Sequence, residues 1–496
     1  MSTVAAETTA PKAQAEQSGF VKAMSLTDAT MLVAGSMIGS GIFIVSADIA
    51  RSLPSPFWLL LAWLITGVIT LLGALAYGEL AAMFPRAGGQ YVFLRESMGP
   101  LLGFLYGWTL FLVIQTGTIA AVAVAFGRFL GVLVPVIGPE RYTWFPRLDF
   151  AISGGAVEAG LSPQRLIALV AIWVLTWINL RGVREGKLVQ TTLTVVKTGA
   201  LAALVILGLT IGRNAQAVAA NFGAGNFVGS IPLDSVLVLA FGSALVGSLF
   251  SSDAWNNVTF AAAEVKDPQR NLPLSLLLGT GLVSLLYVLA NLAYMSTLPL
   301  TGSADGATVL ARGIQYATQD RVGTASAEVI FGSSGTMLMA GAILLSTFGC
   351  ANGLILAGAR VYYAMARDGV FFRRVGTLNA RAVPSAGLIV QSIWVSLLCL
   401  TGTYGQLLNY VIFAALVFYV LTTMGLFILR AKRPDADRPY RAVGYPALPA
   451  LYLALAAAVA VILLIAPKTR TEALSGLVLV LIGIPVYFVW RRVEAS

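Results

Sequence analysis

Long apolar runs separated by short polar segments fill nearly the whole chain. Each run approaches the roughly 20 residues that a helix needs to cross a lipid bilayer. One uncharged stretch is too long for a single helix, and Gly402–Gly405 divides it in two. The pattern predicts an all-α polytopic membrane protein with twelve transmembrane helices, over Ala29–Ala47, Phe57–Tyr77, Leu101–Gly127, Leu166–Leu180, Leu188–Gly212, Ser235–Ala263, Leu272–Leu298, Val329–Ala359, the two halves of Ala382–Leu429, Tyr445–Pro467 and Ala473–Trp490.

The first predicted span contains an unusual group of small residues. Gly35–Phe43 reads Gly-Ser-Met-Ile-Gly-Ser-Gly-Ile-Phe, with Gly39, Ser40 and Gly41 near its centre. Glycine inside a helix costs about 1 kcal/mol relative to alanine, and a broken helix in hydrocarbon is tolerated only where its backbone faces a protein-lined cavity. The segment is therefore either an unwound part of a binding site or a close helix contact through small residues four apart.

Two ionisable residues interrupt other apolar runs. Lys197 lies about nine residues, or roughly 14 Å, into the fifth span, where an unpaired ammonium is costly. It is either functional or a lysine whose long stem reaches toward the interface. Asp253 interrupts the sixth span, between Phe250 and Trp255. Its carboxylate either pairs with a substrate cation, pairs with Lys197, or caps a broken helix.

Interruptions in the first and sixth spans, five spans apart, indicate an inverted-repeat transporter whose substrate lies between two discontinuous helices. The N-terminus of a half-helix offers N–H groups to an anion, and a C-terminus offers carbonyl groups to a cation. A zwitterion satisfies both, and an α-amino acid is the simplest one. The other polar residues of the spans, namely Gln115, Thr116, Asn179 and Asn291, are predicted to form interhelical hydrogen bonds.

The composition supports a membrane protein and excludes several classes. Hydrophobic residues make up 58% and charged residues 11% of the chain, with a mean hydropathy of +0.84. There is no histidine, and the two cysteines, Cys350 and Cys399, both lie in apolar runs. We therefore expect no metal site, no cofactor and no catalytic residues. The protein is predicted not to be an enzyme.

The charges indicate the orientation of the spans. Of the 32 lysines and arginines, 21 fall on the side of the N-terminus, ten on the opposite side, and Lys197 within the membrane. By the positive-inside rule, both termini are predicted to be cytoplasmic. The net charge of +10 therefore reflects topology, and no nucleic-acid partner is expected. Two long outer loops, Gly131–Arg165 and Thr301–Glu328, are either lids or spacers.

Several short motifs lie in order between the appropriate spans. Together they resemble those of the amino acid–polyamine–organocation superfamily of permeases, and most of all the bacterial relatives of the L-type amino acid transporters. The resemblance covers about residues 25–441. The motifs are Gly39–Phe43, Tyr77–Leu80 with Pro85–Tyr91, Asn179–Val183, Glu264–Pro273, Arg360–Tyr362 with Arg367–Gly369, and Arg438–Tyr440.

The resemblance implies a LeuT-like fold of five plus five inverted repeats followed by two further helices. It divides the chain into a disordered cytoplasmic tail (1–24), a ten-helix transport core (25–430) and the two additional helices (431–496). The substrate carboxylate would meet backbone N–H groups at Gly39, Ser40 and Gly41. The amino group would meet the carbonyl groups of Met37 and Ile38 and those of Phe250, Ser251 and Ser252. Phe250 would also be a gate over the substrate.

Lys197 matches a family lysine that occupies the place of sodium in relatives, with Ser346 as its neighbour. We therefore expect a secondary active transporter that moves neutral or cationic L-amino acids by alternating access. It would be a sodium-independent exchanger or proton-coupled. Asp253 departs from the commonest pattern, so the alternative is a cationic amino acid or polyamine antiporter.

The expected partners are the amino acid substrate and the lipid bilayer. The expected location is the plasma membrane, as a multi-pass protein of a bacterial inner membrane. Heteromeric members of the family join an accessory subunit through a cysteine in the loop after the third span. Gly131–Arg165 contains no cysteine, so no disulfide-linked accessory subunit is expected.

Overall fold

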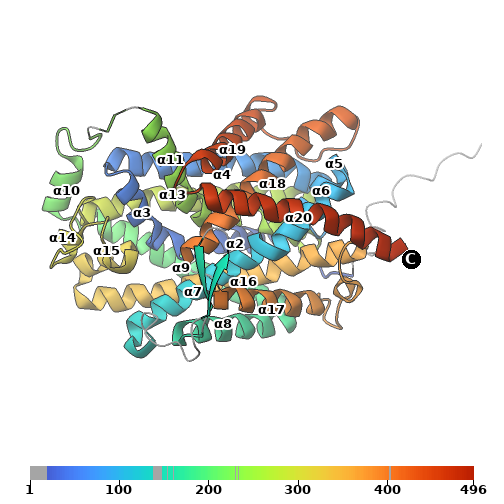
Figure 1. The fold of residues 1–496 in the computed structure, drawn as a ribbon, viewed down its shortest axis with the longest axis horizontal. Helices are drawn as coiled ribbons and strands as arrows, with labels where there is room; N and C mark the ends of the chain where they lie inside the picture. Colours follow the sequence, from blue (N-terminus) through green and yellow to red (C-terminus); the bar gives the residue numbers. More distant parts are fainter. Residues whose placement is uncertain are drawn as a thin grey trace, which may run out of the picture.

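The computed structural model describes residues 19–137, 148–152, 155–159, 161–229, 231–232, 234–401 and 404–495. The helices lie side by side along the long axis of the molecule (Figure 1). Their bounds are α2 Leu26–Met37, α3 Val45–Ser52, α4 Pro56–Met83, α5 Gln90–Met98, α6 Pro100–Thr109, α7 Gln115–Leu133, α8 Pro163–Leu180, α9 Val183–Leu209, α10 Ala215–Phe222, α11 Ser235–Ser251, α12 Asn257–Phe260, α13 Pro268–Thr297, α14 Val309–Arg312, α15 Val322–Phe331, α16 Ser333–Arg367, α17 Ser385–Thr401, α18 Tyr404–Lys432, α19 Ala447–Ile465 and α20 Arg470–Ala495.

Short elements connect these helices. A two-stranded antiparallel hairpin, β1 Leu148–Ile152 with β2 Gly155–Ala159, lies in the first long loop, so the chain is helical apart from this one pair among the described residues. The other short elements are single turns, namely η1 Gly41–Phe43, η2 Leu110–Ile114, η3 Pro135–Ile137, η4 Ala262–Glu264, η5 Thr318–Asp320 and η6 Arg373–Gly376.

Nine helical stretches of the described chain are long and apolar enough to cross a membrane without a break. The other three predicted spans are present in interrupted or shorter form. The first is divided into α2, η1 and α3, the sixth into α11 and α12, and the ninth is the 17-residue α17. The fold class is therefore the predicted all-α polytopic membrane protein, and two of the short spans are the pair, five apart, that an inverted repeat requires.

Local sequence accounts for where several helices begin. Proline occupies the first turn of α4, α6, α8 and α13, a position where its missing N–H has no intrahelical partner in any case. At α2, Ser25 and Asp28 form a reciprocal capping box. The hydroxyl of Ser162 accepts from Arg165 N at the start of α8.

The third span contains a feature that hydropathy does not reveal. α6 and α7 form one continuous helix, Pro100–Leu133, through the π-helical turn η2. A π-turn inserts an extra residue and widens the helix locally, and such turns are frequent at functional sites. Both Leu110 and Ile114, the ends of η2, line a cavity described below.

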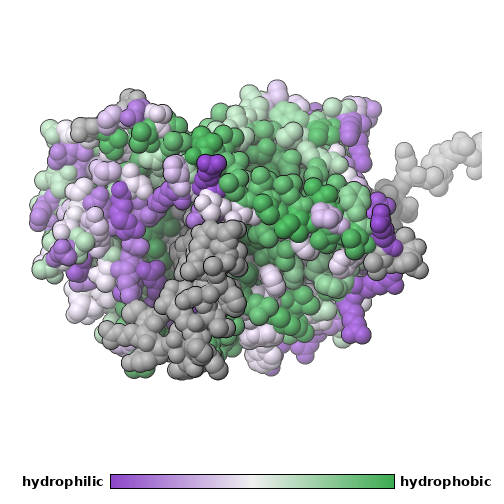
Figure 2. Space-filling view, viewed as in Figure 1, coloured by the Kyte–Doolittle hydropathy of each residue, from purple (hydrophilic) through white to green (hydrophobic). Residues whose placement is uncertain are grey.

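One end of the molecule, here named the terminus end, carries the start of α2 and the end of α20. Met24 forms a β-bridge with Val265. Of the predicted tail 1–24, residues 1–18 lie outside the described residues. Phe372 and Trp490 pack edge to face at the same end. Figure 2 shows an apolar surface over α19 and α20 that gives way to hydrophilic side chains at this end.

Candidate functional site

The first break lies between α2 and α3. Ile38 is extended, with φ −74° and ψ 91°, and the helix resumes only with the short turn η1. Gly41 lies so close to the second break that an added Cβ would be 2.1 Å from the hydroxyl oxygen of Ser251. Within the described part of the chain, no backbone carbonyl accepts from the N–H groups of Gly41 and Ile42, and both residues are buried. Free N–H groups at the start of a helical segment suit an anion.

The second break begins where α11 ends at Ser251. Ala254 has a left-handed backbone, with φ +63°, and the helix resumes at Asn257. The hydroxyl of Tyr287 lies 3.0 Å from the carbonyl oxygen of Met37 and 3.0 Å from that of Ser251. One tyrosine on α13 therefore joins the two broken helices through carbonyl groups at their ends.

Lys197 lies at the end of α2 rather than reaching out to the interface. Its Nζ donates to the carbonyl oxygens of Gly35 and Ile38, both at 2.6 Å, and to that of Ser346 at 3.2 Å. The hydroxyl of Ser346 in turn donates to the carbonyl oxygens of Ile38 (3.1 Å) and Gly39 (3.0 Å). The lysine is 1% exposed, and within the described part of the chain its charge is stabilised by these three carbonyl dipoles.

Asp253 has a different environment from Lys197. Its Oδ1 accepts a 2.5 Å hydrogen bond from the hydroxyl of Tyr419 on α18, and no lysine or arginine of the described chain forms an ion pair with it. The N-cap of α12 is Asn256, which makes no capping hydrogen bond through its side chain. Of the three interpretations of Asp253, pairing with Lys197 and capping of the broken helix therefore do not describe the structure.

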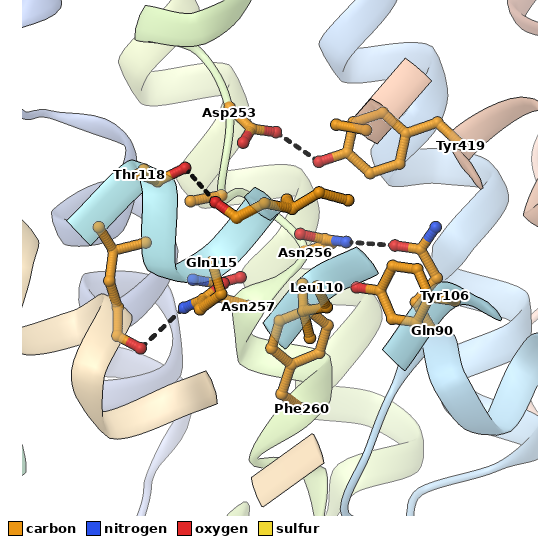
Figure 3. Close-up of a pocket in the computed structure, with 14 residues that line it drawn as sticks. Gln90, Tyr106, Leu110, Gln115, Thr118, Asp253, Asn256, Asn257, Phe260 and Tyr419 are labelled. Atoms are coloured by element: carbon orange, nitrogen blue, oxygen red, sulfur yellow. Dashed lines mark hydrogen bonds between the residues drawn. The ribbon is translucent and has the colours of Figure 1, made fainter. Parts of the chain in front are cut away.

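The carboxylate of Asp253 faces a small closed cavity (Figure 3). Its volume is about 10 Å³, which is room for about one water molecule. The walls come from α5, the third span with its π-turn, the second break, α16 and α18. The polar lining residues are Gln90, Tyr106, Gln115, Thr118, Asp253, Asn256, Asn257 and Tyr419.

A chain of amide hydrogen bonds forms one side of this cavity. Asn256 Nδ2 donates to Gln90 Oε1 at 2.8 Å, and Gln90 Nε2 donates to the hydroxyl of Thr422 at 2.9 Å. The Nδ2 of Asn257 is buried without a protein partner. A second cavity of about 20 Å³ is also lined by Asp253, together with Ser252 and mostly apolar residues. The acid thus borders two small cavities at the second break.

The structure brings most of the predicted site residues together. Met37, Ile38, Gly39, Ser40 and Gly41 lie at the first break, and Phe250, Ser251, Ser252 and Asp253 at the second, all buried. One detail differs from the expectation: the carbonyl oxygen of Ile38 already accepts from both Lys197 and Ser346. A carbonyl oxygen has two lone pairs, so Met37 and Ser251 are the carbonyls better placed to receive an amino group.

Sequence reasoning missed several residues of the site. Tyr287 and Tyr419 are single aromatic residues in apolar spans and give no sequence signal. Gln90 lies within the motif Pro85–Tyr91, and Asn256 lies three residues after Asp253. Their polar side chains at these positions were the signal that could have identified them. The predicted interhelical roles agree with the structure for Gln115, Asn179 and Asn291, which bond to the carbonyl of Leu354, to Asn352 and to Ser46. Thr116 instead donates within its own helix, to Phe111 O.

Comparison with known proteins places the chain among transporters. The sequence pattern of the amino acid permease family matches residues 24–488. The mouse (Mus musculus) large neutral amino acids transporter small subunit 2 is 30% identical over 97% of this chain and 84% of its own length. Its human counterpart is 31% identical over 94% and 80%. The mouse b(0,+)-type amino acid transporter 1 is 27% identical over 95% and 88%.

These relatives correct one prediction. The name "small subunit" makes the first two proteins parts of a larger assembly, so the expectation of no disulfide-linked accessory subunit was wrong. Its premise was too narrow, because the lack of cysteine in one loop concerns one covalent link and says nothing about surfaces that bind a partner. The relatives named here are mammalian, and the bacterial subgroup stays a prediction.

Proposed function

Because this chain belongs to the amino acid permease family, and is therefore an amino acid transporter and not an enzyme, we propose that it is a sodium-independent exchanger. It moves neutral or cationic L-amino acids by alternating access. The observation that carries the proposal is the meeting of the two broken helices at Gly41 and Ser251. There, the buried start of η1 packs against the end of α11, and Tyr287 links the carbonyl group of Ser251 to that of Met37.

The proposed substrate is a zwitterion held mainly by the backbone. Its carboxylate accepts from the N–H groups of Gly41 and Ile42, where the positive end of a helical segment favours an anion. Its ammonium donates to the remaining lone pairs of the Met37 and Ser251 carbonyl oxygens, beside the hydroxyl of Tyr287. Contacts with the backbone recognise only the carboxylate and ammonium groups that all α-amino acids share. Other residues must therefore select the side chain of the substrate.

Sodium independence rests on Lys197. Carbonyl oxygens at the end of α2 and in α16 converge on one point, as oxygen ligands do around a hard cation. The ammonium of Lys197 occupies that point, with three carbonyl oxygens within 3.2 Å. A protein cation therefore takes the role of a sodium ion in fixing the unwound segment, and no gradient of sodium is needed for binding.

Asp253 supports the second candidate, a carrier of cationic amino acids or polyamines. A buried carboxylate without a cationic partner is costly, and its described partner is the neutral hydroxyl of Tyr419. A lysine or arginine side chain, or the second ammonium of a diamine, would supply the missing positive charge. The amides of Asn256 and Asn257 would then line the path of the substrate side chain.

The test is an exchange screen in proteoliposomes with the purified full-length protein. Labelled leucine, arginine and putrescine are each offered with and without sodium and proton gradients. We expect uptake driven by internal amino acid and unchanged by removal of sodium. Strict dependence on a sodium gradient would contradict the exchanger.

The variant Asp253→Asn separates the two candidates. It keeps the size of the side chain and an oxygen that accepts from Tyr419. If a substrate cation pairs with Asp253, arginine uptake falls at least about tenfold, the effect of roughly 1.4 kcal/mol, while leucine uptake persists. Arginine uptake that is unchanged in this variant would remove the cationic role of Asp253.

The finer location also belongs to this proposal. We infer a place in the plasma membrane, the inner membrane of a bacterium, with both termini in the cytoplasm. The excess of lysine and arginine on the side of the termini supports this orientation. The experiment that tests it is argued in the Discussion.

A further inference from the structure

Asp253 differs from the other acids that are buried in the described chain, which are Glu79 and Glu264. Each of those two glutamates forms an ion pair with an arginine. The carboxylate of Asp253 instead accepts from the hydroxyl of Tyr419 (Figure 3) and from the backbone N–H of Ala254, which are both neutral groups. The acid at the second break therefore lacks the compensating cation that the other two have.

The ionisable side chains around Asp253 do not supply a positive charge. Those that interact with its carboxylate come from α4, the third span, α16, α18 and α19, and they are Tyr77, Tyr106, Cys350, Tyr419 and Tyr452. Phenols and thiols in their ordinary range are uncharged at neutral pH. Lys197 on α9 directs its ammonium to three carbonyl oxygens, and the three donors of an ammonium are then all used.

The cavities beside Asp253 are too small for the cationic group of a substrate. Their volumes are about 10 Å³ and about 20 Å³, and a cavity of the smaller size holds about one water molecule. A guanidinium group on its carbon chain fits into neither. A buried carboxyl group without a cationic partner becomes neutral by binding a proton, and a proton needs no further space.

We propose that Asp253 is a proton-binding site and that the cationic side chain of a substrate competes with this proton. A neutral amino acid leaves the proton on the carboxyl group. A cationic amino acid pairs with the ionised group, and the proton leaves to water. The inference rests on the proposed function, because it requires one site that accepts neutral and cationic amino acids in turn.

The competition determines the charge that exchange moves across the membrane. Arginine keeps its own proton, since a guanidinium does not ionise in proteins. When external arginine replaces internal leucine, one positive charge enters as arginine and one leaves as the proton that accompanies leucine. The exchange is therefore electrically neutral, and it makes the interior more alkaline.

The first test is isothermal titration calorimetry of the purified full-length protein, which measures binding without transport. Arginine and leucine are each titrated in phosphate and in Tris buffer, because these buffers take up protons with different enthalpies. We expect arginine to release about one proton and leucine to release none. Over the pH range in which this release is complete, the apparent Kd for arginine should rise about tenfold for each pH unit of acidification, as reciprocal linkage requires, while that for leucine stays constant.

Three variants locate the proton. Asp253→Asn, which resembles the protonated acid, should bind leucine and release no proton with either amino acid. Tyr419→Phe keeps the ring but removes a donor to the ionised carboxylate, so proton release by arginine should continue to a higher pH. Asp305→Asn is the matched control, because Asp305 is an exposed acid in the loop after α13 and should change neither measurement.

The outcomes separate this inference from the function on which it rests. Arginine binding without proton release at any pH would show a permanently ionised carboxylate and would overturn the inference, but the exchanger would stand. Binding of leucine without arginine would also overturn it, because no cation would compete with the proton. Failure of both amino acids to bind would contradict the proposed function, and the inference would fall with it.

A second test follows the proton during exchange. Proteoliposomes loaded with leucine and a pH-sensitive dye are given arginine or leucine outside. We expect alkalinisation of the interior with arginine, no change with leucine, and no effect of an imposed membrane potential on the rate. Arginine entry that a membrane potential accelerates, without a change in internal pH, would overturn the inference.

Discussion

At the scale of single residues, Lys197 illustrates both the reach and the limit of sequence reasoning. Its depth in an apolar run predicted a buried functional amine, and the structure places it 1% exposed among carbonyl oxygens. No sequence feature indicated that two of these oxygens belong to the end of α2, because backbone carbonyls have no sequence signature. Likewise, Asp253 was recognisable as an anomaly, whereas its partner Tyr419 was not.

We predict that Lys197→Ala weakens substrate binding without unfolding the protein. The variant leaves the buried carbonyl oxygen of Gly35 without its donor, at a cost of about 1–3 kcal/mol, and frees the unwound segment to move. The apparent affinity for exchanged amino acid should fall about tenfold or more. Uptake kinetics in proteoliposomes measure this, alongside the elution profile on size exclusion.

Thr198→Ala is the control for this variant. Thr198 is the next residue on α9, and none of the described residues forms a hydrogen bond with its hydroxyl, so its loss should change the apparent affinity little. An affinity in Lys197→Ala that equals that of Thr198→Ala would show that the ammonium does not position the site.

At the scale of elements, hydropathy located the spans because burial in lipid demands about 20 apolar residues in each. The two interrupted helices were also predictable, since glycine, serine and aspartate are poor residues for a lipid-facing helix. The π-turn η2 was not, because Leu110–Ile114 is uniformly apolar and the turn is imposed by packing around the cavity. The sequence thus predicted the interruptions in the first and sixth spans but not the π-turn that widens the third.

The closed site is also held at the terminus end by a connection between elements. Glu264, just after the second break, forms a buried ion pair with Arg360 of α16, with 3.0 Å between Glu264 Oε1 and Arg360 Nη2. The backbone of the same residue receives hydrogen bonds from Ala23 and Met24, both at 2.9 Å. This arrangement joins the segment before α2, the second broken helix and α16. Opening of the site toward the terminus end must therefore separate these three segments.

We predict that Glu264→Gln destabilises the protein strongly, by about 3–5 kcal/mol, because Arg360 is left as a buried charge without a partner. The double variant Glu264→Gln with Arg360→Met should recover much of the lost stability, since no unpaired charge remains. Thermal unfolding of the three proteins in detergent measures this. A double variant that is less stable than Glu264→Gln would contradict the argument.

At the scale of the whole molecule, the two ends differ in charge, and this difference predicts how the protein lies in the membrane. Lysine and arginine are concentrated in the loops at the terminus end, and 21 of the 32 belong to that side. Positively charged loops are retained in the cytoplasm during insertion.

We predict that alkaline phosphatase fused after residue 495 is inactive, whereas the same enzyme inserted in the loop between α13 and α15 is active. Alkaline phosphatase folds only outside the cytoplasm, where its disulfides form. Green fluorescent protein at the same two positions should give the opposite result. The two sites lie at opposite ends of the molecule, so each serves as the control for the other. Active phosphatase at residue 495 would place the arginine-rich end outside and would contradict both the orientation and the positive-inside argument behind it.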